Sequence, residues 1–274
     1  MVLPRIITAI IGIPLILITV YYGGGLYLIM LFVVLLFMIR EYVFMTKSAG
    51  YETSFLGSLV TGTTMFTVII IEQLSFIKTS LYLTSIVVTM IIFILFFIEI
   101  LRQEPVGAVG RIGVSFIGPM LFGWSLAHMF LIRDIRPRGM EYTFILILTI
   151  WICDTASYIF GVLWGKKKLV QNISPKKSVV GLIAGLFTGM FSVVLLQLLF
   201  KIEIFSIKQA SLIGFGIAFF TAVSDLSESL IKRDCGFKDS DNLLPGHGGM
   251  MDRFDSFLFT APLYFYFLRY FLDK

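Results

Sequence analysis

The sequence has little charge and almost no cysteine or histidine. Asp, Glu, Lys and Arg make up 14% of the 274 residues, against about 25% in a soluble domain. The two cysteines, Cys153 and Cys235, are far apart and form no Cys-x-x-Cys pair, so no disulfide framework or zinc site is indicated. The two histidines, His128 and His247, exclude a multi-histidine metal centre. These shortages exclude a soluble enzyme, a disordered protein and a secreted disulfide scaffold.

Long apolar runs fill most of the chain. Hydrophobic residues make up 58% of it, and the mean hydropathy is +0.94. A membrane crossing needs about 20 apolar residues. We therefore predict an all-α polytopic integral membrane protein with about nine transmembrane helices. The expected runs are residues 6–22, 26–45, 55–75, 80–101, 112–132, 142–164, 179–200, 210–224 and 254–272. The first is interpreted as a retained anchor because residues 21–25 offer no small-x-small cleavage site.

The distribution of Lys and Arg predicts the orientation. Nine crossings place the termini on opposite sides, with 14 basic residues on the side of the N-terminus and 8 on the other. The positive-inside rule then places the N-terminus and the two long polar loops, 165–178 and 225–253, in the cytoplasm. We expect the inner (cytoplasmic) membrane, with the active site facing the cytoplasm. The net charge of +5 is explained by this topology, and no nucleic-acid partner is expected.

The two halves of the chain differ in polarity. Residues 1–140 are mostly apolar and are expected to form a transmembrane scaffold, whereas 141–274 contain both long loops and nearly every clustered polar residue. We therefore expect catalysis in 141–274. Gly181, Gly185 and Gly189 form a small-residue stripe on one helix face. Packing within the subunit and a homodimer contact are both left open for this stripe.

The stretch 224–256 contains the densest polar cluster. Continued as a helix, its first half places Asp225, Ser229 and Lys232 on one face. The run 245–249, Pro-Gly-His-Gly-Gly, cannot stay helical and can turn backbone N–H groups towards an anion. Asp252 and Asp255 follow, and we expect them as neighbours at the start of the last helix.

Clustered carboxylates at a membrane boundary repel one another unless a cation joins them. Mg²⁺ prefers oxygen ligands and usually takes one or two carboxylates together with substrate phosphates. The stretch therefore indicates phosphate chemistry with Mg²⁺ as cofactor, and a second cation is left open. The alternative is a solvated loop with ordinary surface ion pairs.

A second polar stretch, 154–178, supports phosphate binding. Asp154 lies in an apolar run, where an ionised carboxylate costs roughly 2.5–3.5 kcal/mol on insertion scales. A basic loop with the run 174–178, Ser-Pro-Lys-Lys-Ser, follows it. For Asp154, a functional role and structural pairing stay open.

These motifs resemble those of the phosphatidate cytidylyltransferase (CDP-diacylglycerol synthase) family, and the hydropathy profile extends the resemblance over the whole chain. The matching residues are Ser229, Lys232, Arg233, Lys238, Asp239, Pro245, His247, Gly248, Gly249, Asp252, Arg253 and Asp255, together with the 174–178 run. The chain departs from the family pattern at Asp241, where a small residue is usual, and at Ser178, where Thr is usual. It also has Val179-Val180 in place of an aromatic-Glu pair.

The resemblance implies that CTP and phosphatidate react to give CDP-diacylglycerol and pyrophosphate, with membrane lipid around the enzyme. Asp225, Asp252 and Asp255 are expected to hold the metal, and Lys232, Asp252 and Asp255 are expected to be catalytic. The expected substrate-binding residues are Ser174, Lys176, Lys177, Ser229, Arg233, Lys238, His247, Gly248, Gly249 and Arg253. For His247 we favour binding over proton transfer, because a phosphate monoester is already largely ionised at neutral pH.

Two other functions fit the sequence less well. A transferase that consumes CDP-diacylglycerol is expected to contain an Asp-Gly-x-x-Ala-Arg run, which does not occur here. A transporter is expected to place charges at mid-membrane in broken helices, often duplicated in two halves. Here the polar residues gather at one membrane face and in one half of the chain, so the enzyme is favoured.

Overall fold

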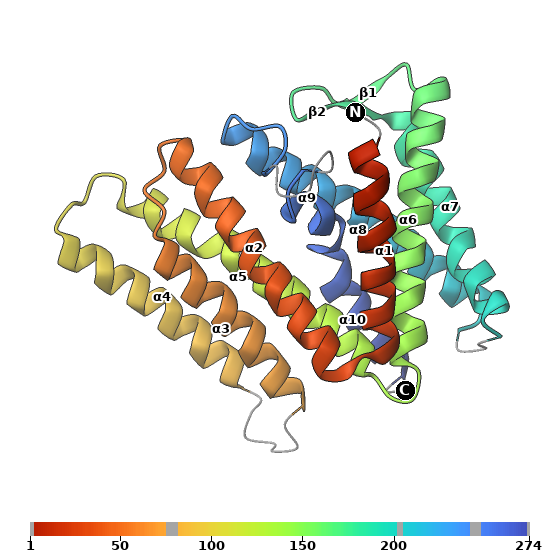
Figure 1. Ribbon diagram of the computed structural model, residues 1–274, viewed down its shortest axis with the longest axis horizontal. Helices are drawn as coiled ribbons and strands as arrows, with labels where there is room; N and C mark the ends of the chain where they lie inside the picture. Colours follow the sequence, from red (N-terminus) through yellow and green to blue (C-terminus); the bar gives the residue numbers. More distant parts are fainter. Residues whose placement is uncertain (1–2, 75–81, 202–204, 242–247, 273–274) are drawn as a thin grey trace. The chain divides into compact units, whose positions relative to one another are not determined.

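The computed structural model describes residues 3–74, 82–201, 205–241 and 248–272. Its helices closely follow the apolar runs of the sequence, in the order shown in Figure 1. The first five are α1 (Leu3–Tyr22), α2 (Gly24–Ser48), α3 (Phe55–Leu74), α4 (Leu83–Arg102) and α5 (Ala108–Asp134). Then come α6 (Gly139–Trp164), strands β1 (Lys168–Val170) and β2 (Ser174–Ser178), α7 (Val179–Leu199) and α8 (Ile207–Asp234). The chain ends with α9 (Met251–Phe254), the 3₁₀ helix η2 (Asp255–Phe257) and α10 (Thr260–Leu272).

The predicted all-α polytopic membrane protein is confirmed. Within the described ranges, the seven helices α2 to α8 are long and apolar enough to cross a membrane. The other two expected crossings correspond to α1, whose residues 10–22 form a shorter apolar helix, and to α10 with 13 residues. The predicted helical continuation of the eighth run beyond residue 224 is also confirmed, because α8 extends to Asp234.

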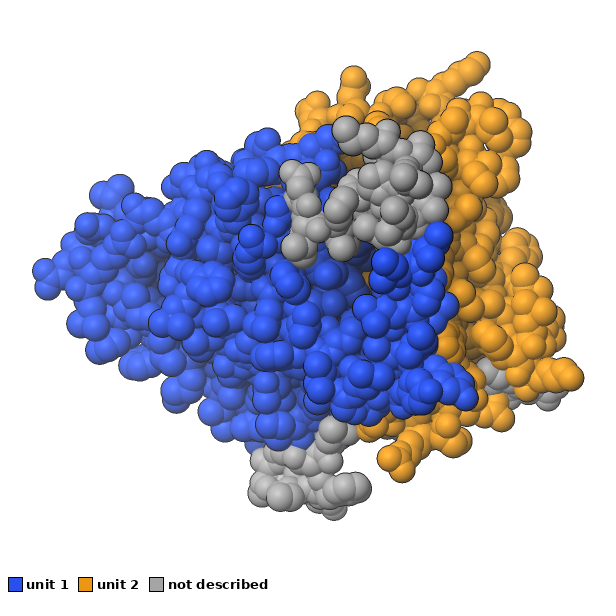
Figure 2. All heavy atoms as spheres, viewed as in Figure 1, with its two compact units in different colours: residues 1–131, 234–254 blue, residues 132–233, 255–274 orange. Residues whose placement is uncertain are grey.

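The chain divides into two compact units, coloured separately in Figure 2. Unit 1 comprises residues 1–131 and 234–254, and unit 2 comprises 132–233 and 255–274. The segment 234–254 is thus grouped with the N-terminal helices. The proposed division into a scaffold of 1–140 and a catalytic part of 141–274 concerns function, and it stays a prediction.

In unit 1 a tight connection joins the first two helices. Gly23 and Gly24 have φ angles of 64° and 53° and connect α1 to α2, in a region that side chains disfavour. Helices α3 and α4 lie side by side (Figure 1). From α2, Tyr42 donates a hydrogen bond to the carbonyl of Val114 at 2.9 Å, and its ring contacts that of Phe122. Helix α2 is thereby fastened to α5.

In unit 2 the glycine stripe of α7 allows close helix packing. A Cβ atom at Gly181 would meet the carbonyl oxygen of Ser157 on α6, and one at Gly189 would meet Gly214 and Ala218 on α8. These contacts are within the chain, as one of the two interpretations of the stripe expected. The homodimer that the stripe left open stays a prediction.

The basic loop between α6 and α7 is a β-hairpin. Strands β1 and β2 pair antiparallel, with Lys168 opposite Ser178 and Val170 opposite Ser174. Ser178 is the N-cap of α7, and its hydroxyl accepts a hydrogen bond from the backbone N–H of Gly181 at 3.1 Å. The hydroxyl that Ser178 shares with the usual Thr therefore has a capping role here.

The expected continuous helix over 254–272 is interrupted. The chain forms α9, then η2, and begins α10 only at Thr260. The hydroxyl of Ser224 in α8 accepts the backbone N–H of Phe259 at 3.0 Å, while Asp255 accepts the N–H of Ser256 at 2.5 Å. In a continuous helix these two N–H groups would instead donate hydrogen bonds to backbone carbonyl groups one turn earlier. Asp252 and Asp255 are therefore not neighbours on one α-helix, which corrects the sequence expectation.

Candidate active site

A cavity of about 730 Å³, lined by both apolar and charged residues, lies within unit 2. Residues of α6, the β1–β2 hairpin, α7 and α8 line it. The charged residues of this lining are Asp154, Lys168, Lys176, Lys177 and Asp225. Four of them are site residues that the sequence singled out, from stretches up to 71 positions apart. One of these four is Asp154, for which the sequence left both a functional role and structural pairing open.

An ion pair joins the basic hairpin to the acidic helix. Lys177 Nζ lies 2.5 Å from Asp225 Oδ2, and both side chains are partly exposed. Lys177 stands on β2 immediately before the cap of α7, so the hairpin directs it towards α8. The cavity thus presents cationic and anionic groups together, as the binding of a metal–phosphate complex requires.

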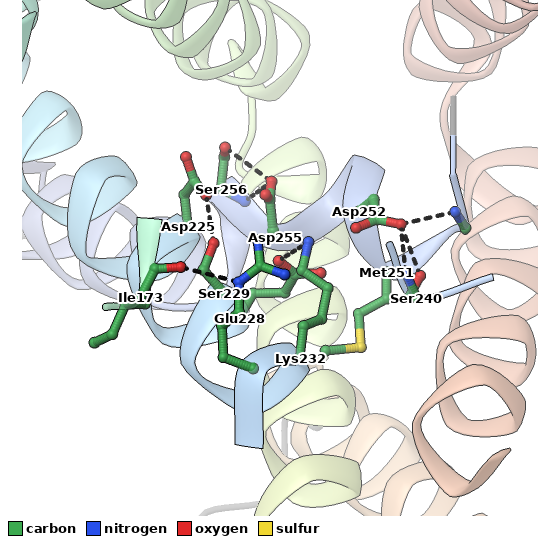
Figure 3. A network of polar contacts seen from close by, with 12 residues as sticks. Ile173, Asp225, Glu228, Ser229, Lys232, Ser240, Met251, Asp252, Asp255 and Ser256 are labelled. Atoms are coloured by element: carbon green, nitrogen blue, oxygen red, sulfur yellow. Dashed lines mark hydrogen bonds and ion pairs between the residues drawn. The ribbon is translucent and has the colours of Figure 1, made fainter. Parts of the chain in front are cut away.

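Asp225 belongs at the same time to a group of three carboxylates. One oxygen atom each of Asp225, Glu228 and Asp255 lies within 4.8 Å of the others. Asp225 and Glu228 are one helical turn apart on α8, and Asp255 comes from η2 (Figure 3). Lys232 Nζ forms an ion pair with Glu228 Oε2 at 2.6 Å. Figure 3 shows this pair and Ser229 beside Asp225. The helical spacing of these four α8 residues explains their shared face.

The electrostatics of this group favour a cation. Asp255 lies outside the seven candidate membrane helices. Burial, followed by the negative charges of Asp225 and Asp154, raises the pKa of Asp255 to about 7. A divalent cation would offset this repulsion, and carboxylate oxygens are the ligands that Mg²⁺ prefers. The donor set therefore fits Mg²⁺.

Asp252, expected to share this group, is engaged elsewhere within unit 1. Its Oδ2 accepts hydrogen bonds from the backbone N–H and the hydroxyl of Ser240, at 2.8 and 2.9 Å (Figure 3). It also accepts the N–H of Gly249 at 2.8 Å. In unit 2 the third carboxylate beside Asp225 and Asp255 is that of Glu228, which the sequence argument had not assigned to the metal. The role of Asp252 stays a prediction.

The glycine-rich run was expected to direct N–H groups at an anion. The N–H groups of Gly249, Met250 and Met251 do point at carboxylates, but these belong to Asp252 and Glu41. Gly248, with a φ of 80°, makes the turn that precedes them. His247 and the rest of 242–247 lie outside the described residues.

The other predicted binding residues are spread over both units. In unit 2, Arg233 donates a hydrogen bond to the carbonyl of Ile173 in the hairpin at 3.2 Å. Ser174 begins β2 opposite Val170. In unit 1, Lys238 and Arg253 are exposed. Their substrate contacts stay predictions.

Two acidic residues that contact parts of the motif stretch were not singled out from the sequence. Glu228 lies within the motif stretch, and its spacing of three from Asp225 was a usable signal. Glu41 lies about 200 positions away, in an apolar run. Its only sequence signal is the cost of a carboxylate inside such a run.

Comparison with known proteins gives the family. Residues 3–271 match the model of the cytidylyltransferase family. The phosphatidate cytidylyltransferase of Staphylococcus aureus (strain COL) is 42% identical over 132 residues, 47% of this chain and 50% of that protein. That of Staphylococcus epidermidis (strain ATCC 35984) is 39% identical over 130 residues, with the same coverage. The uncharacterized protein YnbB of Escherichia coli K12 is 36% identical over 177 residues, 63% of this chain and 58% of that protein.

The aligned region spans about half the length of the curated relatives named phosphatidate cytidylyltransferase. The family model, by contrast, extends over nearly all of this sequence. Its range includes the cavity, the hairpin and the three-carboxylate group described above. This chain therefore belongs to the cytidylyltransferase family.

Proposed function

We propose that this protein transfers the cytidylyl group of CTP to phosphatidate, giving CDP-diacylglycerol and pyrophosphate. One observation carries the proposal: Asp225 lines the cavity beside Lys176 and Lys177, and it also belongs to the three-carboxylate group. A cation held by that group would therefore border a cavity with basic residues. The names of the relatives, which align over about half of their length, support the substrates.

The reaction joins two anions. A phosphate oxygen of phosphatidate attacks the α-phosphorus of CTP, and the bond between that phosphorus and the bridging oxygen to the β-phosphate breaks. Pyrophosphate leaves with the electron pair. Because both reactants are negatively charged, catalysis consists mainly of positioning and charge neutralisation. Lys176 and Lys177 would supply positive charge from the hairpin side of the cavity.

Asp225, Glu228 and Asp255 would hold Mg²⁺ in this proposal. When bound, the metal would neutralise triphosphate charge and polarise phosphoryl oxygens. Lys232, on Glu228 at 2.6 Å, would keep that carboxylate oriented. Asp154, on the cavity wall, is the residue best placed to serve the second cation that the sequence left open.

The surroundings of the cavity suit a lipid substrate. Three of the elements that line it, α6, α7 and α8, are candidate membrane helices. Two lining residues, Tyr158 and Val162 on α6, are 72% and 68% exposed. In a bilayer such apolar surface faces acyl chains, so a phosphate headgroup could enter the cavity while its chains stay in the membrane.

The test is a transfer assay with the protein purified in detergent micelles. Radiolabelled CTP and phosphatidate with Mg²⁺ are expected to yield labelled CDP-diacylglycerol, and chelation of the metal should stop the reaction. With ATP in place of CTP, turnover should be at least about tenfold lower, because a pocket with hydrogen-bonding groups for one base rejects another. No product from CTP would refute the function, and equal turnover of ATP would refute the nucleotide preference.

The membrane orientation is tested by cysteine labelling. Lys167 and Lys201 are exposed residues on either side of α7, a candidate membrane helix. In cells, Lys167→Cys should react with a maleimide applied from the cytoplasmic side, and Lys201→Cys only from the opposite side. The two native cysteines are buried and provide a low background. Labelling of both positions from one side would show that α7 does not cross, and the reverse pattern would overturn the orientation.

A further inference from the structure

A hydrogen bond joins α8 to the segment that carries Asp255. The hydroxyl of Ser224, the residue before Asp225, accepts the backbone N–H of Phe259 at 3.0 Å. Ser224 stands on α8 and is 0% exposed, whereas Phe259 lies between η2 and α10. All four residues belong to unit 2. The bond therefore lies inside one unit and connects residues 35 positions apart.

The local backbone explains why the N–H of Phe259 turns to a side chain on another helix. In a continuous helix it would donate to the carbonyl of Asp255. That carbonyl instead accepts the N–H of Leu258 at 3.2 Å, in the tight turn of η2. The carbonyl of Phe259 accepts the N–H of Leu263 at 3.2 Å, as part of α10. Ser224 thus supplies an acceptor at the break, where an N–H group shielded from water needs one.

A second contact, one turn earlier on α8, supports the same attachment. Thr260 donates its only hydroxyl hydrogen to the carbonyl of Ser256 at 2.7 Å. The hydroxyl oxygen of Thr260 also lies 3.4 Å from that of Thr221, which can therefore act as the donor. Both threonines are buried. Two hydroxyl groups of α8 thus contact consecutive residues just after η2.

This attachment bears on the position of Asp255 in the three-carboxylate group. Ser256 orients the Asp255 carboxylate, because its N–H and its hydroxyl donate to Oδ1 at 2.5 and 3.1 Å (Figure 3). Asp225 and Glu228 share α8, so the helix itself sets their spacing. Asp255 reaches them from another segment, and like charges this close repel one another. Tertiary contacts must therefore hold its segment against α8.

We infer that Ser224 is a positioning residue for the cation site: through the N–H of Phe259 it holds Asp255 beside Asp225 and Glu228. This role rests on the proposed function, in which these three carboxylates bind Mg²⁺. It adds what keeps them together before the ion arrives. Ligands that are already in place need no costly ordering when the ion binds. Ser224 contacts a backbone group and acts through it.

The first variant is Ser224→Ala, which removes the acceptor and keeps a good helix former in α8. Asp255 should be held less firmly. We therefore expect the free Mg²⁺ concentration for half-maximal cytidylyl transfer to rise by about 10- to 100-fold, the usual loss when an outer partner of a metal ligand is removed. At saturating Mg²⁺ most of kcat should return, because all three carboxylates are still present.

Two further variants separate this role from packing and general stability. Ser224→Cys fills a similar space with a weak acceptor, so it should behave like Ser224→Ala. A wild-type Mg²⁺ response in Ser224→Cys would show that only volume matters and would overturn the inference. Ser227→Ala is the matched control, because the exposed hydroxyl of Ser227 donates to the carbonyl of Val223 within α8 at 2.9 Å. It should keep the wild-type Mg²⁺ response. A smaller active fraction in Ser224→Ala with an unchanged Mg²⁺ midpoint would also contradict the positioning role.

Binding of Mn²⁺ gives a readout that does not depend on activity. Oxygen sites that suit Mg²⁺ also suit Mn²⁺, so electron paramagnetic resonance can measure Mn²⁺ bound to the protein in detergent micelles without CTP. Asp255→Asn defines the ions bound elsewhere. The Kd for Mn²⁺ at the site should rise at least about tenfold in Ser224→Ala and Ser224→Cys, and not in Ser227→Ala.

The outcomes distinguish the role of Ser224 from the proposed function. Weaker Mn²⁺ binding in Ser224→Ala, together with a wild type that transfers no cytidylyl group, would refute the function and leave the positioning role standing. An unchanged Mn²⁺ affinity in Ser224→Ala, an equal loss in Ser227→Ala, or a wild type that binds no Mn²⁺ beyond Asp255→Asn would refute the positioning role.

Discussion

Asp225→Asn and Asp255→Asn are each expected to lower kcat for cytidylyl transfer by at least about 10²-fold, with near-normal yield of folded protein. Each substitution keeps the side-chain shape and removes one of three carboxylates whose oxygens lie within 4.8 Å. Because each of these carboxylates is repelled by the other two, neutralising one relieves repulsion, and folding should not suffer. The Mg²⁺ concentration for half-maximal rate should rise in both variants. Steady-state assays across a Mg²⁺ titration measure both quantities.

The double variant tests whether the two residues serve one site. The fold-decrease in kcat of Asp225→Asn/Asp255→Asn should be much smaller than the product of the two single decreases. If both residues bind one metal ion, either substitution alone already removes most of the contribution of that ion. Glu141→Gln is the matched control: it changes a partly buried carboxylate on α6, outside the cavity lining, in the same unit. Full activity or an unchanged Mg²⁺ response in Asp225→Asn would favour ordinary ion pairs, each worth at most about 1 kcal/mol.

Lys177→Met is expected to lower kcat/KM by roughly 10²- to 10³-fold, the usual loss when one preorganised group that stabilises transition-state charge is removed. Lys177 lines the cavity and lies 2.5 Å from Asp225. Its charge therefore faces the position where phosphate and metal would meet. Methionine keeps most of the side-chain volume and removes the charge, and Lys177→Arg should retain part of the activity.

A purely structural role for Lys177 makes a different prediction. If Lys177 only balances the charge of Asp225, its removal would tighten Mg²⁺ binding and leave kcat at saturating Mg²⁺ unchanged. Lys167→Met is the control, since Lys167 is exposed and lies outside the cavity lining. It should keep wild-type kinetics. An unchanged kcat in Lys177→Met, with a lower Mg²⁺ requirement, would contradict a role in substrate binding.

The sequence by itself determined the helices and the face that carries the acidic group. Apolar runs predict membrane helices because hydropathy and backbone pairing are local properties, satisfied within each segment. The register of Asp225, Ser229 and Lys232 follows from the helical period, and α8 continues to Asp234 as expected. The long motifs also indicate the family without any knowledge of the fold, because residue types at fixed spacings are a property of the sequence alone.

Only the tertiary structure decided which carboxylates meet. Asp252 was expected beside Asp255 because one continuous helix would place them together, but the chain divides into α9, η2 and α10. At this break the side chains of Ser224 and Asp255 accept hydrogen bonds from backbone N–H groups, and Ser224 belongs to another helix, α8. A hydrogen bond between distant segments leaves no periodic signal. Within unit 2, Glu228 meets Asp225 and Asp255, and within unit 1 Asp252 accepts hydrogen bonds from Ser240 and Gly249.

The hydrogen-bond partners of Glu41 could not be predicted from the sequence either. It stands 199 positions before Ser240, in a run that hydropathy assigns to a membrane helix. The sequence shows only that a carboxylate in that run is costly. Which donors offset the cost depends on how α2 packs against the segment 234–254, and such packing is set by many weak contacts between residues far apart in the chain. Local patterns therefore determined the helices and the chemistry of the motif, whereas the partners of each buried charge were decided by the packing of the folded chain.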